Sequence, residues 1–329
     1  MEIQQTAGKR NRSIIIEECP LIVQTINLTK RYGKLTALNN LQLNIEEGES
    51  FGFIGPNGAG KTTTIKILAT LLQPTWGEAR ICGHVVGYES RKIRPLIGYV
   101  PDFFGAYEDM VVVEYLEFFA SAYNIAGKQR ARVVEDVLEL TDLASKRDAL
   151  VDSLSRGMQQ RLSVARVLLH DPKVLLLDEP ASGLDPRARI EMRELLKELR
   201  RMGKTIIISS HILPELADLC TTVGIIEQGQ LLFHGPIAEI IRRVKTGTKL
   251  HIRVTEQQDL AALLLQRTKG IRAVSQMDGK LLVELEQPTH DFTPIAKLLL
   301  DNNFRIRELH EEEVNLETAF MRMTKGMVQ

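Results

Sequence analysis

The sequence predicts an α/β protein built around a parallel sheet, followed by a smaller α+β domain. Residues 174–177 and 205–208 are apolar without alternation, as expected of parallel strands that are covered on both faces. Helical patterns alternate with strands to about residue 243, an order that is typical of an α/β domain. Beyond a polar stretch at 244–249, the order β-α-β-β-α-β suggests a small ferredoxin-like domain.

The individual elements follow from the period of their apolar residues. Residues 21–28 and 41–46 alternate between apolar and polar side chains, which predicts two strands of a half-buried sheet. Further strands are expected at 51–54, 96–101, 174–177 and 205–208, and helices at 65–72, 111–143 (two helices), 155–170 and 186–202. In the second domain, strands are expected at 249–254, 271–276, 279–286 and 304–309, and helices at 256–268, 291–302 and 314–324.

These elements divide the chain into three expected parts. They are an N-terminal extension at 1–20, an α/β domain at 21–245 and an accessory domain at 246–329. A length of 329 residues agrees with about two domains. The accessory part contains no chemical motif, so its role, structural or regulatory, stays open at this point.

Composition limits the class of protein. The chain is 26% charged and 44% hydrophobic, as in a globular protein, and its 42 basic residues balance 42 acidic ones, so we expect no nucleic-acid partner. The three cysteines (Cys19, Cys82 and Cys220) lack C-x-x-C spacing, which argues against a disulfide scaffold or a zinc site and favours a reducing compartment. No apolar run reaches the 18–20 residues that span a bilayer, and the polar N-terminus is unlike a signal peptide. A role at a membrane would therefore require docking on another chain.

A glycine-rich loop carries the strongest chemical signal. The sequence GPNGAGKT at 55–62 fits the phosphate-binding pattern G-x-x-x-x-G-K-[ST], with an apolar strand before it and a helical pattern behind it. Its glycines let backbone N–H groups approach phosphate oxygens, and the helix N-terminus favours anions. Lys61 can reach the β- and γ-phosphates, and the Thr62 hydroxyl can bind Mg²⁺. The expected nucleotide-binding residues of this segment are Gly55, Pro56, Asn57, Gly58, Ala59, Gly60, Lys61, Thr62 and Thr63.

A second signal is the sequence VLLLDE at 174–179. An apolar strand that ends in Asp178 can place a carboxylate beside the phosphate-binding loop, where it can hold Mg²⁺ directly or through water. Glu179 would then face the γ-phosphate and could orient an attacking water or accept its proton. The alternative is that the two acidic residues merely end a strand before Pro180. The presence of the loop favours the functional interpretation.

Together with LSRGMQQR at 154–161, ASGLDP at 181–186 and His211, these motifs resemble the ATP-binding cassette (ABC) ATPases over about residues 21–240. The resemblance implies a P-loop NTPase fold with a parallel core sheet, an antiparallel β subdomain and a helical subdomain. It also implies ATP and Mg²⁺ as cofactors and hydrolysis of ATP to ADP and phosphate.

The resemblance also assigns roles to single residues. Tyr32 stands where the family stacks an aromatic ring on adenine, and His211 stands where a histidine contacts the γ-phosphate. Ser155 and Gly157 match the signature LSGGQ, which binds the γ-phosphate of ATP held by the opposite subunit. The residues from Gly183 to Asp185 match the loop that crosses the dimer interface. From the residues alone, Ser155 could equally be an ordinary helix cap, and Tyr32 could be plain surface.

Three positions depart from the family pattern. Arg156 and Met158 replace the first glycine and the glutamine of LSGGQ, and Asp102 stands where the family has a glutamine near Mg²⁺ and the attacking water. Aspartate could still bind the metal through water. Such variants, and the C-terminal sequence VNLETAFMRMTKG, resemble the branch that serves two-component multidrug or ABC-2-type exporters.

Aromatic residues are concentrated between 103 and 123, where seven of them lie: Phe103, Phe104, Tyr107, Tyr115, Phe118, Phe119 and Tyr123. Aromatic anchors are typical of protein interfaces, but helical spacing is equally typical of a packed core, which we expect for about half of them. We expect Phe103, Phe104 or Tyr107 to line a groove for a permease helix.

The sequence therefore predicts the ATPase subunit of an ABC exporter. Two such subunits, in a homodimer or a heterodimer, would drive a separate ABC-2-type permease from the cytoplasmic face of the membrane. Two other functions are compatible with the motifs, namely a soluble ABC ATPase of the DNA-repair or translation type and a regulatory module without useful turnover. The first usually carries long coiled coils or two cassettes, and the retained Lys61, Asp178, Glu179 and His211 argue against the second.

Overall fold

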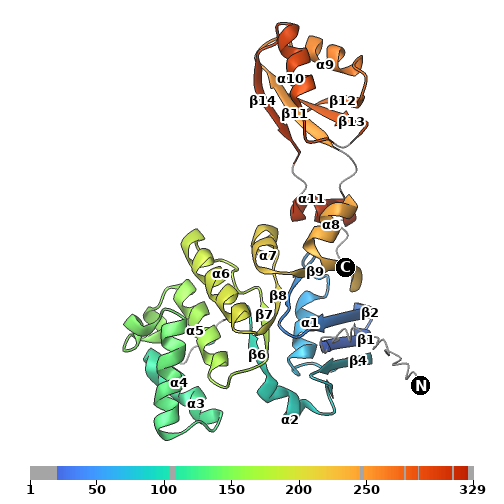
Figure 1. The fold of residues 1–329 in the computed structure, drawn as a ribbon. Helices are drawn as coiled ribbons and strands as arrows, with labels where there is room; N and C mark the ends of the chain where they lie inside the picture. The colour runs from blue at the N-terminus through green and yellow to red at the C-terminus, as the bar shows by residue number, and fades with distance from the viewer. Residues whose placement is uncertain are drawn as a thin grey trace, which may run out of the picture.

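The computed structural model describes residues 21–103, 105, 109–244, 248–277, 279–287, 289–312 and 315–324. The expected extension at 1–20, and Phe104 and Tyr107 of the aromatic segment, lie outside the described residues. The described part forms a larger body and a smaller one that stands apart from it (Figure 1). Within the described part of the chain, none of the helices combines the length and hydropathy that crossing a bilayer requires.

A six-stranded sheet forms the centre of the larger body, with the order β10-β9-β3-β8-β7-β6. Its strands are β3 (Ser50–Ile54), β6 (Ile97–Val100), β7 (Val174–Asp178), β8 (Thr205–Ser209), β9 (Thr222–Glu227) and β10 (Gln230–Pro236). All neighbours pair in parallel except β10, which pairs antiparallel with β9. Every residue of β3, β7 and β8 is buried, so the parallel sheet expected from unbroken apolar runs is confirmed.

A second, antiparallel sheet has the order β2-β1-β4-β5. Its strands are β1 (Leu21–Tyr32), β2 (Leu35–Glu46), β4 (Trp76–Ile81) and β5 (His84–Val85). Helix α1 (Lys61–Leu68) lies between the two sheets (Figure 1), and its Ile65 and Leu68 share one hydrophobic cluster with Leu41 of β2 and Leu176 of β7. The helix that begins at the phosphate-binding loop is therefore held from both sides.

Further helices of the larger body are α3 (Val112–Ala122), α4 (Gly127–Leu140), α5 (Arg156–Leu168), α6 (Pro186–Arg201) and α7 (Leu213–Leu219), with the short α2 (Ser90–Ile93) and 3₁₀ turns at Arg94–Leu96, Ala144–Lys146 and Val151–Ser153. Of these, α3 to α6 gather beyond the strands β6 and β7, whereas α7 lies near β8 (Figure 1). Of the aromatic segment, Tyr115 is fully buried, whereas Phe103 is 80% exposed. The segment therefore supplies both core and surface residues.

The smaller body has its own sheet and its own core. Its strands β11 (Lys249–Val254), β12 (Ile271–Met277), β13 (Lys280–Leu285) and β14 (Ile306–Glu311) pair antiparallel in the order β12-β13-β11-β14. Helices α9 (Gln258–Gln266) and α10 (Thr293–Asp301) complete the expected β-α-β-β-α-β unit. Its cluster, which includes Leu250, Leu265 and Leu299, is separate from the clusters of the larger body.

The last described helix packs outside the small sheet. Helix α11 (Leu316–Met323) lies beside α8 (Ile237–Val244), against the larger body and not on the small sheet (Figure 1). Leu316 and Ala319 are buried in the cluster that also contains Leu177 and Ile240. The Arg322 guanidinium donates a hydrogen bond to the Val244 carbonyl oxygen at 2.9 Å. The small domain is thus connected to the larger body at both ends, by α8 and α11.

Replacing Leu316 with alanine should destabilise the larger body, because a truncated side chain leaves a cavity in its core. Such substitutions at buried positions cost about 2–5 kcal/mol of unfolding free energy. The single tryptophan, Trp76, lies in β4, so its fluorescence during urea unfolding follows the larger body. We expect a lower midpoint for Leu316→Ala and a change within about 0.5 kcal/mol for Met321→Ala, which is 68% exposed. An unchanged midpoint for Leu316→Ala would contradict this packing.

Candidate active site

The phosphate-binding loop joins β3 to α1, and its glycines are required by close neighbours. A Cβ on Gly55 would lie 2.3 Å from the Ile226 carbonyl oxygen, and one on Gly60 would lie 2.6 Å from a Leu38 methyl carbon. Gly60 also has φ 111°, which L side chains rarely adopt, at the position where α1 begins. The loop therefore exposes its backbone N–H groups to an anion at a helix N-terminus.

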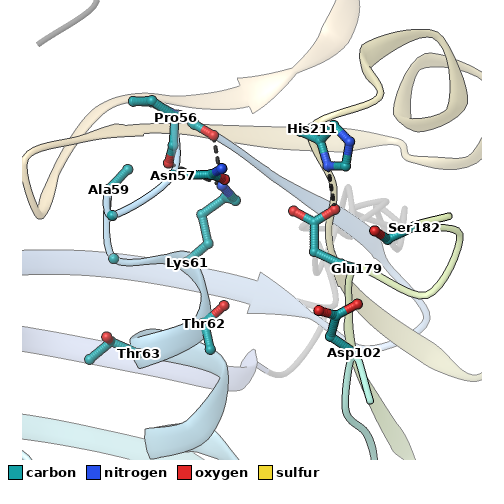
Figure 2. Close-up of a pocket in the computed structure, with 13 residues that line it drawn as sticks. Pro56, Asn57, Ala59, Lys61, Thr62, Thr63, Asp102, Glu179, Ser182 and His211 are labelled. Atoms are coloured by element: carbon teal, nitrogen blue, oxygen red, sulfur yellow. Dashed lines mark hydrogen bonds and ion pairs between the residues drawn. The ribbon is translucent and has the colours of Figure 1, made fainter. Parts of the chain in front are cut away.

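The loop forms one wall of a pocket with a cavity volume of about 550 Å³ (Figure 2). The opposite wall comes from the ends of β6, β7 and β8 and the turns that follow them. The lining residues are Gly55, Pro56, Asn57, Gly58, Ala59, Gly60, Lys61, Thr62, Thr63, Asp102, Glu179, Ser182 and His211. The structure thus brings the loop predicted from sequence together with Asp102, Glu179 and His211, and it adds Ser182.

Lys61 is held inside the loop by its own backbone. Its ammonium group donates to the Gly55 carbonyl oxygen at 2.7 Å and to the Pro56 carbonyl oxygen at 3.1 Å. Burial lowers the pKa of Lys61, and the carboxylates of Glu179 and Asp178 act in the opposite direction. The amine thus stands at the loop centre, where phosphate oxygens can replace the carbonyl oxygens as acceptors.

Asp178 is anchored by two hydroxyl groups. Thr62 Oγ1 donates to Asp178 Oδ1 at 3.0 Å, and Ser209 Oγ donates to the same oxygen at 2.7 Å. The Ser209 hydroxyl also accepts a hydrogen bond from the backbone N–H of Glu179 at 3.1 Å. Because β7 and β8 are parallel and pair Asp178 with Ser209, both residues stand at the same edge of the sheet. Ser209 therefore positions two acidic residues at once.

Sequence reasoning missed Ser209 and Ser182. Ser209 directly follows the apolar run at 205–208, so the sequence does place a hydroxyl residue at the end of a predicted parallel strand, and this could have marked it as a site residue. Using that signal requires knowledge that β8 is the neighbour of β7. Ser182 lies in the ASGLDP segment and lines the pocket. It is directed there by the turn after Glu179, in which Ser182 N–H donates to the Glu179 carbonyl oxygen at 3.0 Å.

Glu179 faces the pocket in a constrained conformation. Its φ of 51° is uncommon for a residue with a side chain, and the Ser209 carbonyl oxygen accepts a bond from its N–H at 3.1 Å. Glu179 Oε2 lies 2.7 Å from His211 Nδ1, across the pocket from Lys61 (Figure 2). A carboxylate that is oriented in this way can accept a proton from a water in the pocket.

Asp102 follows β6 and lies beside Glu179 in the pocket (Figure 2). Its charge acts on Tyr99, because burial and the nearby carboxylates of Asp178 and Asp102 raise the pKa of that phenol to about 12. The oxygens of Thr62, Asp178 and Asp102 are of the hard type that Mg²⁺ prefers. The donor set therefore fits the metal expected from sequence, and the metal contacts stay a prediction.

The signature residues lie outside this pocket. Ser155 begins α5, and its hydroxyl accepts a weak bond from Met158 N–H at 3.4 Å. Gly157 packs against the next helix, since a Cβ there would lie 2.6 Å from Ala188 Cβ. Asp185 caps α6 by accepting from the N–H groups of Arg187 at 2.9 Å and Ala188 at 3.0 Å. A contact of these residues with ATP stays a prediction.

Tyr32 also lies outside the pocket. It is 47% exposed at the end of β1, with the Lys30 ammonium 5.2 Å from its ring centre. An exposed aromatic ring on this sheet is available for stacking on a base. Tyr32 is not among the residues that line the pocket, so its stacking on adenine stays a prediction.

A parallel sheet with a glycine loop, a lysine and an acidic strand end defines the chain as a P-loop nucleoside triphosphatase. A family model described as ABC transporter matches residues 38–182. The bacitracin transport ATP-binding protein BcrA of Bacillus licheniformis is 34% identical over 307 residues, which cover 93% of this chain and 98% of that protein. The chain belongs to the ABC transporter family and is the ATP-hydrolysing subunit of such a transporter.

Other comparisons agree with this assignment. The Nod factor export ATP-binding protein I of Burkholderia lata is 41% identical over 303 residues, or 92% of this chain and 97% of that protein. A solved ATP-binding subunit of an ABC transporter is 28% identical, with a TM-score of 0.61, over 68% of this chain and 92% of that one. A dimeric post-hydrolysis cassette bound to ADP and phosphate is 29% identical, with a TM-score of 0.59, over 65% of this chain and 98% of that one. The expected fold class and ATPase activity are thereby confirmed.

Replacing Ser209 with alanine should lower kcat for ATP hydrolysis about tenfold to a hundredfold, because a hydrogen bond to a charged group is worth about 1.5–3 kcal/mol. Asp178 would lose a donor, and the Glu179 N–H would lose an acceptor. Steady-state ATPase assays check the prediction. The control is Ser163→Ala, because Ser163 is equally buried but lies in α5 outside the pocket. A wild-type kcat for Ser209→Ala would contradict the positioning role.

Proposed function

We propose that two copies of this chain enclose two ATP molecules and drive export through separate permease subunits. The observation that carries the proposal is the separation of Ser155 from the pocket that contains Lys61 and Glu179. A chain that carries both motifs at different places can complete each site only with a second chain. The relatives support this arrangement, since the related cassette bound to ADP and phosphate is described as dimeric.

The pocket residues suit hydrolysis of the terminal phosphate. Water attacks the γ-phosphorus, the bond to the bridging oxygen of ADP breaks, and the water proton passes to the Glu179 carboxylate. His211, 2.7 Å from that carboxylate, keeps it oriented and lies close enough to the pocket to contact the γ-phosphate. Lys61 and the loop N–H groups stabilise the charge that develops on the phosphate oxygens.

A magnesium ion would be held by the Thr62 hydroxyl and the Asp178 carboxylate, with Asp102 as a further oxygen ligand or a ligand through water. The ion supplies charge neutralisation on the β- and γ-phosphate oxygens. The hydrogen bond between Thr62 and Asp178 keeps the hydroxyl group and the carboxylate close together beside the loop. Asp102 lies beside Glu179 in the same pocket (Figure 2).

The membrane partner we propose is an ABC-2-type permease, reached from the cytoplasmic face. Two relatives are transport or export ATP-binding proteins, which favours a transporter over a soluble repair or translation ATPase and over a regulatory module. Phe103 directly follows Asp102 of the pocket and is 80% exposed, so it can link the nucleotide site to a partner surface. A homodimer suffices chemically, and a heterodimer with a similar subunit would use the same surfaces.

The substitution Glu179→Gln tests the proposed cycle, because the amide keeps the shape of the side chain but cannot take the water proton. We expect kcat to fall about 10²- to 10⁴-fold, with ATP binding retained and dimers accumulating in ATP. Size-exclusion chromatography with light scattering and an ATPase assay measure both effects. Glu198→Gln, at an exposed carboxylate that pairs with Arg201 on α6, is the control and should behave as wild type. Wild-type turnover by Glu179→Gln would remove Glu179 from the mechanism.

The substitution Phe103→Ala tests the proposed partner surface. We expect it to leave ATP hydrolysis by the isolated subunit within about twofold, while co-purification with the proposed permease and coupled transport are lost. Tyr88→Ala is the matched control, since Tyr88 is an aromatic residue that is 92% exposed elsewhere on the larger body. Unchanged co-purification and transport with Phe103→Ala would show that the permease docks at another surface.

A further inference from the structure

Arg156 lies where the signature helix meets the loop after Glu179. It is the first residue of α5, directly after Ser155. Its guanidinium covers Gly183, because Nη1, Cζ and Nη2 lie 2.5, 2.6 and 2.9 Å from the place that a Cβ of Gly183 would occupy. Three atoms of one plane at nearly equal distances indicate that the flat face of the guanidinium rests on the glycine.

Gly183 lies within a short loop with two anchored ends. The loop begins at Glu179, and Ser182 N–H donates to the Glu179 carbonyl oxygen at 3.0 Å. It ends at Asp185, whose carboxylate caps α6. Gly183 itself has φ +67°, a conformation that glycine adopts without strain. Ser182, next to it, lines the ATP pocket.

The guanidinium has no polar contact that would hold it elsewhere. Among the described residues, none makes a hydrogen bond or ion pair with Arg156, whereas Arg161, Arg187 and Arg189 of the same region all pair with carboxylates. The approach to Gly183 is the contact that the structure gives for this exposed guanidinium among the described residues. A planar, weakly hydrated guanidinium suits such stacking better than an ammonium group does.

A second contact joins the same two segments. Gly157, the next residue of α5, packs so closely on Ala188 of α6 that a Cβ would lie 2.6 Å from Ala188 Cβ. Two consecutive signature residues thus contact the segment that starts at Glu179 and enters α6. The start of α5 and this segment are consequently held at one relative position.

We propose that Arg156 is a positioning residue that couples the two ATP sites of the dimer. Its contact with Gly183 joins a loop to a helix. The loop presents Glu179 and Ser182 to the ATP of this chain, and the helix presents Ser155 to the ATP of the partner. The proposal rests on the dimer of the proposed function. Loss of the contact leaves the phosphate-binding loop intact but loosens Glu179, so kcat should fall while ATP binding persists.

A double-mutant cycle between Arg156→Gly and Gly183→Ala tests the contact. A Cβ at position 183 would displace the exposed, flexible Arg156 guanidinium from the glycine, and the residue is also strained at φ +67°, but the strain is present in both backgrounds and cancels in the cycle. We expect Gly183→Ala to lower kcat about tenfold in the wild-type background and less than about threefold in the R156G background. The ATP dissociation constant of the monomer should stay within about twofold throughout.

The substitution Arg156→Lys separates the planar contact from the charge. Lysine keeps the positive charge but offers no flat face, so we expect it to lower kcat as far as Arg156→Gly does. Wild-type kcat for Arg156→Lys would overturn the proposal in favour of a charge contact with the partner's phosphate. Arg187→Ala is the matched control, because Arg187 is an exposed arginine in the first turn of the neighbouring helix, and it should leave kcat unchanged.

Melting temperatures of the nucleotide-free variants test the contact between Arg156 and Gly183 separately from the proposed dimer. Coupled effects of Arg156→Gly and Gly183→Ala on the melting temperature would support the contact without any ATP. Additive effects on both melting temperature and kcat would overturn the proposal. A wild-type chain that hydrolyses ATP as a monomer would instead overturn the dimer, and with it the coupling of two sites.

Discussion

The parallel pairing of β7 with β8 is the constraint on which the site depends. It sets Asp178 opposite Ser209, so that one hydroxyl group donates to the Asp178 carboxylate and accepts from the Glu179 N–H. Because β3 is the other neighbour of β8, the phosphate-binding loop leaves the sheet at the same edge. The carboxyl ends of adjacent parallel strands thereby gather a cradle for phosphate, two acidic residues and a histidine.

Rigidity is distributed unevenly around this edge. The loop and α1 are held between two sheets, and Lys61 is hydrogen-bonded to its own loop. The His211 side chain is 56% exposed, whereas that of its neighbour Glu179 is only 16% exposed. An exposed histidine at the mouth of this pocket is compatible with the proposed closure of the site by a second chain.

The small domain is built into the chain in a way that affects the larger body. It has its own core, yet α8 before it and α11 after it both pack on the larger body, and α11 also lies against α7. Helix α7 begins two residues after His211. The small domain is therefore connected on both sides to helices of the larger body, and one of them, α11, contacts the helix that follows His211.

The sequence by itself determined most of the elements and the chemistry of the loop. Unbroken apolar runs predicted buried parallel strands, and GPNGAGKT predicted a phosphate cradle, because local backbone and side-chain requirements are written in consecutive residues. Only the tertiary structure decided that Ser209 bridges Asp178 and Glu179, that Leu316 packs on the larger body and that Arg156 rests on Gly183. Each of these contacts joins segments distant in the chain, and its existence depends on strand order and helix packing, which periodicity along a single sequence does not encode.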